Sequence, residues 1–167
     1  VGDDDAGGRQ GAALDGAGVD TRWLRRLTGV PTGTAFIQVD SRGENTIVVV
    51  QGANAHVALP VGDVEPQVVV TQNEIPPAAQ QEAVALAART GARLVINAAP
   101  APESPPPWYG AADPLVVNEH EAAQLATSDE AGAGLLRQLR ERTGARSVVM
   151  TLGERGALVD DGTEVHA

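Results

Sequence analysis

The sequence predicts an α/β protein built on a parallel sheet. From residue 67 onward, short apolar segments typical of strands alternate with longer segments that have a helical pattern, which is the order expected of βαβ units. Aromatic residues make up only 2% of the chain, so Val, Leu, Ile and Ala must fill the core, as they commonly do in buried parallel strands. Right-handed crossovers should connect these strands.

The region before residue 67 follows a different pattern. A weak helical segment at residues 9–14 should end at Gly16 and Gly18. Residues 34–40 alternate between polar and apolar, and residues 46–51 are β-branched and apolar, which together predict a β-hairpin. Because the second strand of this hairpin is apolar on both faces, we expect a ligand or a partner to cover it.

The α/β region reads as a regular succession of elements. Pro76 and Pro77 open a helix that stops at Gly91, and Asp161-Gly162 predicts a tight turn within a final antiparallel hairpin. The predicted strands cover residues 68–71, 93–97, 115–117 and 147–152, the predicted helices residues 76–91, 119–126 and 129–142, and the final hairpin residues 157–165. We expect a single domain over residues 1–167.

Composition excludes several classes of function. A net charge of -10 argues against binding to nucleic acid or to an anionic membrane. All 12 basic residues are arginine, so the chain has no lysine for a P-loop or a Schiff base. It has no cysteine, which excludes disulfides and thiol chemistry and favours a cytoplasmic location. No apolar run approaches the roughly 20 residues that span a bilayer.

Three polar clusters follow predicted parallel strands. In Asn118–Glu121 an amide and two carboxylates stand where a strand meets a helix, a place that can hold a cation with phosphates. The same residues can also simply start a helix. In the second cluster, Glu74 is placed to bind a polyol, or it is a solvated loop residue. Because the carboxyl ends of parallel strands meet at one edge, the clusters together favour a ligand site.

The third cluster, residues 151–156, combines a threonine with two glycines. Glycines allow the backbone to approach a phosphate or nucleoside closely, although such loops also occur simply where a chain turns.

Five segments occur in an order and spacing that resemble the ribokinase/PfkB sugar-kinase family over essentially the whole chain. They are residues 32–54 and the segments QNEIP, VINAAPAP, VVNEHEAAQL and TLGERGAL. The resemblance implies a ribokinase-like three-layer α/β/α fold with a parallel central sheet. It also implies a small β-hairpin lid at about residues 33–52, and an α/β core at about residues 67–167 that is incomplete in this chain.

The resemblance also implies roles for individual residues. Glu74 matches the carboxylate that binds sugar hydroxyls, and three lid residues match positions that pack over the sugar: Ala35, Ile37 and Val49. Asn118 and Glu121 match an N-x-x-E motif that organises Mg²⁺ through water, which suits a cation that dehydrates reluctantly. The residues that match the ATP-binding loop are Thr151, Leu152, Gly153, Glu154, Arg155 and Gly156, with Asn118 beside them. Glu119 and His120 fall at variable positions and receive no role.

Two parts of the family pattern do not occur in these residues. The family places its general-base aspartate in a Gly-Ala-Gly-Asp motif, where backbone N–H groups also form an anion hole. Here Gly132-Ala133-Gly134 is followed by Leu135 and lies in a predicted helix, so it is not a displaced copy. The Gly-Gly-Lys-Gly-type sugar-binding segment is also missing. We therefore expect no catalytic residue in this chain and an inactive fragment.

The expected function is ATP- and Mg²⁺-dependent phosphorylation of the primary hydroxyl of a small sugar, with ribose converted to ribose 5-phosphate. A monovalent cation, K⁺, is a further expected ion in the complete protein, and the lid is expected to pair two copies into a homodimer. Two alternatives stay open. The chain is a non-catalytic remnant that binds nucleotide or sugar, or it belongs to a sister sugar or nucleoside kinase.

Overall fold

The computed structural model describes residues 1–59 and 64–167. By their contacts these residues form two compact units, one of residues 1–60 with 74–76 and the other of residues 61–73 with 77–167. Each unit is described by itself, and the single domain expected from the sequence stays a prediction.

The first unit begins with helix α1 (Asp5–Gly16), which is longer than predicted because Asp4 caps it. Asp4 accepts hydrogen bonds from the Gly7 N–H (2.8 Å) and from both the N–H and the hydroxyl of Thr32 (2.8 and 2.6 Å). These bonds, led by the Thr32 hydroxyl, lower the pKa of Asp4 from 3.8 to about 2. The hydrogen bonds to Asp4 therefore connect the start of helix α1 to Thr32, which precedes the hairpin.

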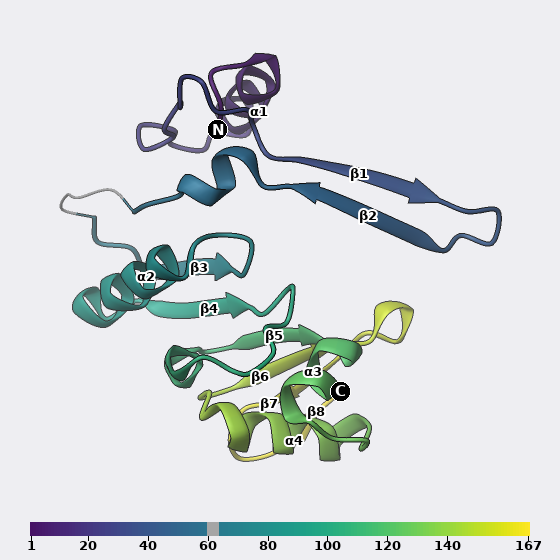
Figure 1. The fold of residues 1–167 in the computed structure, drawn as a ribbon. Coiled ribbons are helices and arrows are strands. Elements are labelled where there is room, and N and C mark those ends of the chain that lie inside the picture. Colours follow the sequence, from purple (N-terminus) through teal and green to yellow (C-terminus); the bar gives the residue numbers. More distant parts are fainter. Residues whose placement is uncertain (60–63) are drawn as a thin grey trace. The chain divides into compact units, whose positions relative to one another are not determined.

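The predicted hairpin is confirmed. Strands β1 (Thr34–Val39) and β2 (Asn45–Val50) pair in antiparallel register, and the short helix η1 (Gly52–His56) follows them (Figure 1). Asp40 closes the turn by accepting hydrogen bonds from the N–H groups of Arg42 and Glu44 (2.8 and 3.0 Å). Every residue of both strands is exposed, and Phe36 and Ile37 are 62% and 63% exposed.

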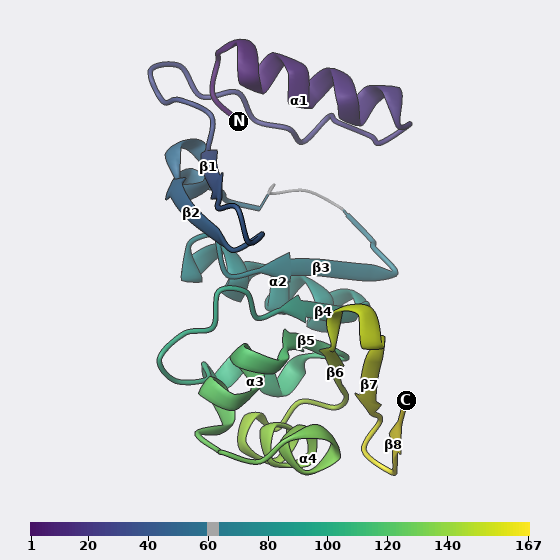
Figure 2. The same ribbon diagram turned by 90° about the vertical axis from the view of Figure 1, so that its right-hand side faces the viewer.

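The second unit is a six-stranded sheet with the strand order β3-β4-β5-β6-β7-β8. The first four strands are parallel and the last two join antiparallel, as predicted. Figure 2 shows β7 and β8 beside β6 near the end of the chain. The strands are β3 (Val68–Gln72), β4 (Arg93–Asn97), β5 (Leu115–Asn118), β6 (Val148–Thr151), β7 (Ala157–Asp160) and β8 (Val165–His166).

Three helices and a short 3-10 turn pack on one face of this sheet. Consecutive strands are also neighbours in space, so right-handed crossovers place every helix on the same side. The core between the two layers is aliphatic, whereas Val68 and Val70 on the opposite face are 49% and 71% exposed. The elements are α2 (Pro77–Thr90), η2 (Pro107–Ala111), α3 (Glu119–Ala126) and α4 (Gly132–Thr143).

Helix α4 begins at Gly132, three residues after the predicted start at residue 129. The hydroxyl of Ser128 accepts a hydrogen bond from the Glu130 N–H (3.1 Å), which stabilises a local turn there.

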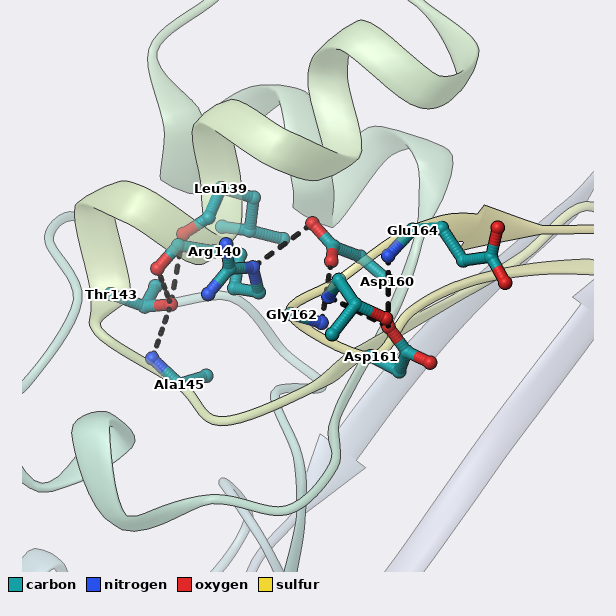
Figure 3. A network of polar contacts seen from close by, with 9 residues as sticks. Leu139, Arg140, Thr143, Ala145, Asp160, Asp161, Gly162 and Glu164 are labelled. Atoms are coloured by element: carbon teal, nitrogen blue, oxygen red, sulfur yellow. Dashed lines mark hydrogen bonds and ion pairs between the residues drawn. The ribbon is translucent and has the colours of Figure 1, made fainter.

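A polar network joins α4 to the final hairpin (Figure 3). The Arg140 Nε donates to Asp160 (3.0 Å), and the Gly162 N–H donates to the other carboxylate oxygen of Asp160 (2.9 Å). Asp160 is 3% exposed, so its buried charge has both an ionic partner and a backbone donor. The network fixes β7 against α4 at the start of β6, where Val148 pairs with Asp160.

Candidate nucleotide-binding edge

Two of the predicted motifs meet at the carboxyl ends of β5 and β6. Asn118 is the last residue of β5 and Thr151 the last residue of β6, and the sheet register places them opposite each other. Both residues are exposed, and the Thr151 hydroxyl donates to the carbonyl of Val117 (3.3 Å). The fold therefore brings residues that are far apart in the sequence to one edge of the second unit, which we call the β5–β6 edge (residues 118–121 and 151–156).

A capping box starts helix α3 at this edge. The Glu121 N–H donates to Asn118 Oδ1 and the Asn118 N–H donates to Glu121 Oε2, each at 2.8 Å. These two bonds satisfy backbone donors that the first turn of a helix leaves without a partner. The capping box also fixes the direction of both side chains. It uses one carboxylate oxygen of Glu121 and leaves Oε1 outside the box.

The donors at this edge fit a hydrated magnesium ion. Within residues 1–59 and 64–167, no group of three or more His, Cys, Asp or Glu side chains is placed to hold a metal. One carboxylate and one amide at a strand end suit a cation that keeps most of its waters and takes phosphate oxygens as further ligands. They do not suit a site in which protein groups surround the metal.

The loop after β6 is a compact exposed turn. The Leu152 N–H donates to the Gly156 carbonyl (2.8 Å), and the short helix η3 (Gly153–Arg155) lies between them. Gly153 and Gly156 have φ angles of 59° and 87°, and a Cβ added at either would meet no atom within 4 Å. Glycine is therefore needed here for the left-handed backbone and not for lack of space.

An ion pair connects this loop to helix α3. Arg155 Nη2 lies 2.6 Å from Glu119 Oε2, and the two side chains are 68% and 47% exposed. Such an exposed pair contributes little to stability, but it orients the Arg155 guanidinium beside the edge. The sequence around Glu119 predicts no role for it, because the pair forms only when β5 and β6 are aligned. His120 is exposed.

The residues predicted to bind sugar belong to the first unit. Ala35 pairs directly with Val49, and Ile37 lies two residues further along β1, so all three side chains share one face of the hairpin. Glu74 is exposed in the loop after β3 and groups by its contacts with the first unit.

The amino ends of the strands carry a different feature. A cavity of about 380 Å³ lies there, lined in part by Gly91, Arg93, Asp113 and Arg146. No residue of the β5–β6 edge lines this cavity.

Comparisons with known proteins identify the family to which this chain belongs. The family model described as "pfkB family carbohydrate kinase" matches residues 1–167. The chain belongs to the pfkB family. Ribokinase from Mus musculus is 34% identical over 153 residues, which covers 84% of this chain and 47% of the mouse protein. Ribokinase from Haemophilus influenzae is 31% identical over 168 residues, covering 95% of this chain and 55% of that protein.

This pfkB-family chain thus spans about half the length of the curated relatives it matches. A solved structure of Arabidopsis thaliana ribokinase complexed with ribose and ATP matches with a TM-score of 0.85 and 23% identity. The match covers 99% of this chain and 58% of the Arabidopsis chain. The likeness confirms the predicted ribokinase-like three-layer α/β fold, of which the second unit here has the sheet and the helices of one face. No helix in the described part of the chain is long and apolar enough to cross a membrane.

Proposed function

We propose that this chain forms part of an ATP- and Mg²⁺-dependent kinase that phosphorylates the primary hydroxyl of ribose to give ribose 5-phosphate. The observation that carries the proposal is the register of β5 and β6, which places Asn118 opposite Thr151 and the loop at residues 152–156. The family match supports phosphoryl transfer to a carbohydrate. The mouse and Haemophilus relatives, both ribokinases, support ribose as the acceptor.

In this proposal the β5–β6 edge binds the phosphate donor. The loop from Thr151 to Gly156 lies against the nucleotide, and the Arg155 guanidinium is oriented beside it by Glu119. Asn118 and Glu121 hold the waters of Mg²⁺ from fixed positions, because the capping box sets their side chains before any ligand binds. When bound, Mg²⁺ would offset the negative charge of the phosphates.

The sugar is bound by residues of the first unit. Glu74 accepts hydrogen bonds from sugar hydroxyls, which are stronger than neutral bonds because the acceptor is charged. Ala35, Ile37 and Val49 cover the apolar side of the sugar from one face of the hairpin. The opposite face of the hairpin pairs with a second copy to form a homodimer. We further propose a cytoplasmic location, K⁺ as an additional ion, and no nucleic-acid or membrane partner.

The residues of this chain bind and orient, and they do not supply the general base. A missing general base reduces a rate by about 10²–10⁴, and a missing anion hole by about 10²–10³ more. A coupled ADP-release assay on the 167 residues with ribose should therefore show almost no turnover. Robust turnover would contradict this, and a panel of sugars and nucleosides in a longer active protein would expose a sister kinase.

The role of Glu74 is tested by Glu74→Ala in a longer active protein that contains this chain. Loss of one hydrogen bond to a charged group costs about 1.5–3 kcal/mol, so the KM for ribose should rise by roughly 10- to 150-fold. The exposed Glu141→Ala on α4 is the matched control and should leave the KM unchanged. An unchanged KM in Glu74→Ala would remove Glu74 from the sugar site.

A further inference from the structure

A partly buried network of hydrogen bonds surrounds Asn73, the residue immediately before Glu74. The Asn73 side chain donates to the Pro100 carbonyl (2.7 Å) and to the Tyr109 hydroxyl (2.8 Å). Its carbonyl oxygen accepts from Gln80 Nε2 (2.7 Å), and the Tyr109 hydroxyl also lies 3.2 Å from it. The Asn73 N–H donates to the Ala99 carbonyl (3.2 Å). One side chain thus joins the end of β3 to α2, to η2 and to the loop after β4.

The network continues beyond Asn73 through Gln80. The same Gln80 Nε2 donates to the Gln72 carbonyl (2.7 Å), and its carbonyl oxygen accepts from the Trp108 indole N–H (3.2 Å). Gln80 is 4% exposed and Tyr109 is fully buried. Burial raises the pKa of the Tyr109 hydroxyl, so this group stays neutral and can donate and accept within the network. Removing one of these hydrogen bonds costs free energy, because the polar groups of Gln80 and Tyr109 would stay buried without a partner.

We propose that Asn73 is a positioning residue that holds the Glu74 carboxylate in place for sugar binding, with Gln80 as its support. The inference rests on the proposed function of Glu74. Asn73 is bonded covalently to Glu74, so the backbone direction at Asn73 determines where Glu74 begins. Every member of the network, Asn73 included, lies in the second unit, so the backbone is held at Asn73, the residue from which the chain continues to Glu74.

An asparagine suits this place better than other residues of similar size. Its two amide hydrogens reach two different acceptors, and its carbonyl oxygen accepts from Gln80 at the same time. Leucine would satisfy none of these partners. Aspartate would keep an acceptor for Gln80 but would lose the donors to Pro100 and Tyr109.

The test compares backbone order and ribose affinity in variants of the 167-residue chain. By ¹⁵N relaxation, the Glu74 amide of the unchanged chain should have an order parameter near 0.85, and Asn73→Leu should lower it below about 0.6. Val117 in β5 should keep its value. Asn73→Asp should give an intermediate result, and Gln80→Leu should lower order at Glu74 less than Asn73→Leu. Gln138→Leu, which removes from α4 an amide that donates a hydrogen bond to Glu130, should change nothing.

Ribose titration then separates this inference from the proposed function. If Glu74→Gln weakens ribose binding, Asn73→Leu should weaken it by a similar factor, at least tenfold. Unchanged order at Glu74 in Asn73→Leu would overturn the positioning role whatever the titration shows. If Glu74→Gln leaves ribose binding unchanged while Asn73→Leu still disorders Glu74, the proposed sugar role fails and the positioning of the loop stands.

Folding is monitored in the same samples. The chain has two tryptophans, so Trp23→Phe assigns the remaining indole signal to Trp108. That signal should shift in Gln80→Leu, which removes its acceptor, and stay sharp if the core is intact. If Asn73→Leu fails to fold, Gln80→Leu and Asn73→Asp decide the question, and full order at Glu74 in both would overturn the proposal.

Discussion

The lid hairpin and the β5–β6 edge are both predicted to bind ligands, yet they are built in opposite ways. The hairpin is largely apolar and every residue of its strands is exposed. The edge is polar and stands on strands whose inward residues, among them Leu115, Val117 and Met150, are at most 1% exposed. A packed core therefore fixes the edge before any ligand arrives. The hairpin has apolar side chains that gain burial only when a ligand or a second copy covers them.

The largest effect should come from the core of the second unit. Ile96 is fully buried in β4, and Ile96→Ala removes packed atoms and leaves a cavity. Such changes cost about 2–5 kcal/mol, so urea unfolding should shift to clearly lower concentration. A loss below about 1 kcal/mol would show that the sheet is loosely packed, and the contrast with the hairpin would fail.

A smaller effect is expected at the edge itself. Asn118→Ala removes the capping bond to the Glu121 N–H and should lower the free energy of unfolding by about 0.5–2 kcal/mol. It should also weaken binding of ATP in the presence of Mg²⁺, measured by calorimetry. Asn118→Ser keeps a capping oxygen and should restore most of the stability but not the nucleotide affinity. Unchanged stability and affinity in Asn118→Ala would argue against both roles.

The stability of the first unit should depend on pH through the Asp4 carboxylate. Its pKa is about 2 in the folded chain, below the ordinary value of 3.8. The stability that Asp4 contributes is therefore present above pH 3.8 and is lost as the pH falls through about 2. An NMR titration of the Asp4 carboxyl should show this midpoint, and Asp4→Asn should remove the dependence. A midpoint near 3.8 would contradict the capping interaction.

The smallest effect on stability should come from the hairpin. Phe36→Ser and Ile37→Ser should each change the free energy of unfolding by no more than about 0.5 kcal/mol, because both side chains are exposed. The two residues point to opposite faces, so their other effects should differ. Phe36→Ser should reduce dimerisation in sedimentation experiments, and Ile37→Ser should reduce ribose affinity. A cost above 1 kcal/mol for either would show that the hairpin is already buried by its own unit.

Much of the fold follows from local pattern. The strands of the second unit and the helices between them appear where apolar runs, prolines and glycines predict them, because each signal acts within a few residues. The carboxyl-edge position of Asn118 and Thr151 follows from strand order alone. The early start of α1 was not predicted, although its cap is a local bond from the Gly7 N–H to Asp4. Only the further bonds from Thr32, 28 residues from Asp4, have no signal in the surrounding sequence.

The residues of the candidate site that the sequence does not predict also depend on contacts between distant parts of the chain. Glu119 pairs with Arg155 across 36 positions of the sequence, and only the β5–β6 register brings them together. The sequence predicts no role for Asn73, because its partners Gln80 and Tyr109 come from other elements. Side chains whose role depends on long-range packing carry no pattern in the sequence around them.

The most direct test of the account follows glycine and asparagine amides in ¹⁵N-labelled protein during titration with ATP and Mg²⁺. Binding at the β5–β6 edge predicts saturable shifts at Asn118, Gly153 and Gly156, with Gly91 and Gly144 unchanged because neither belongs to that edge. Shifts confined to Gly91 and Gly144, or no saturable shift at all, would contradict the assignment of this edge as the nucleotide site.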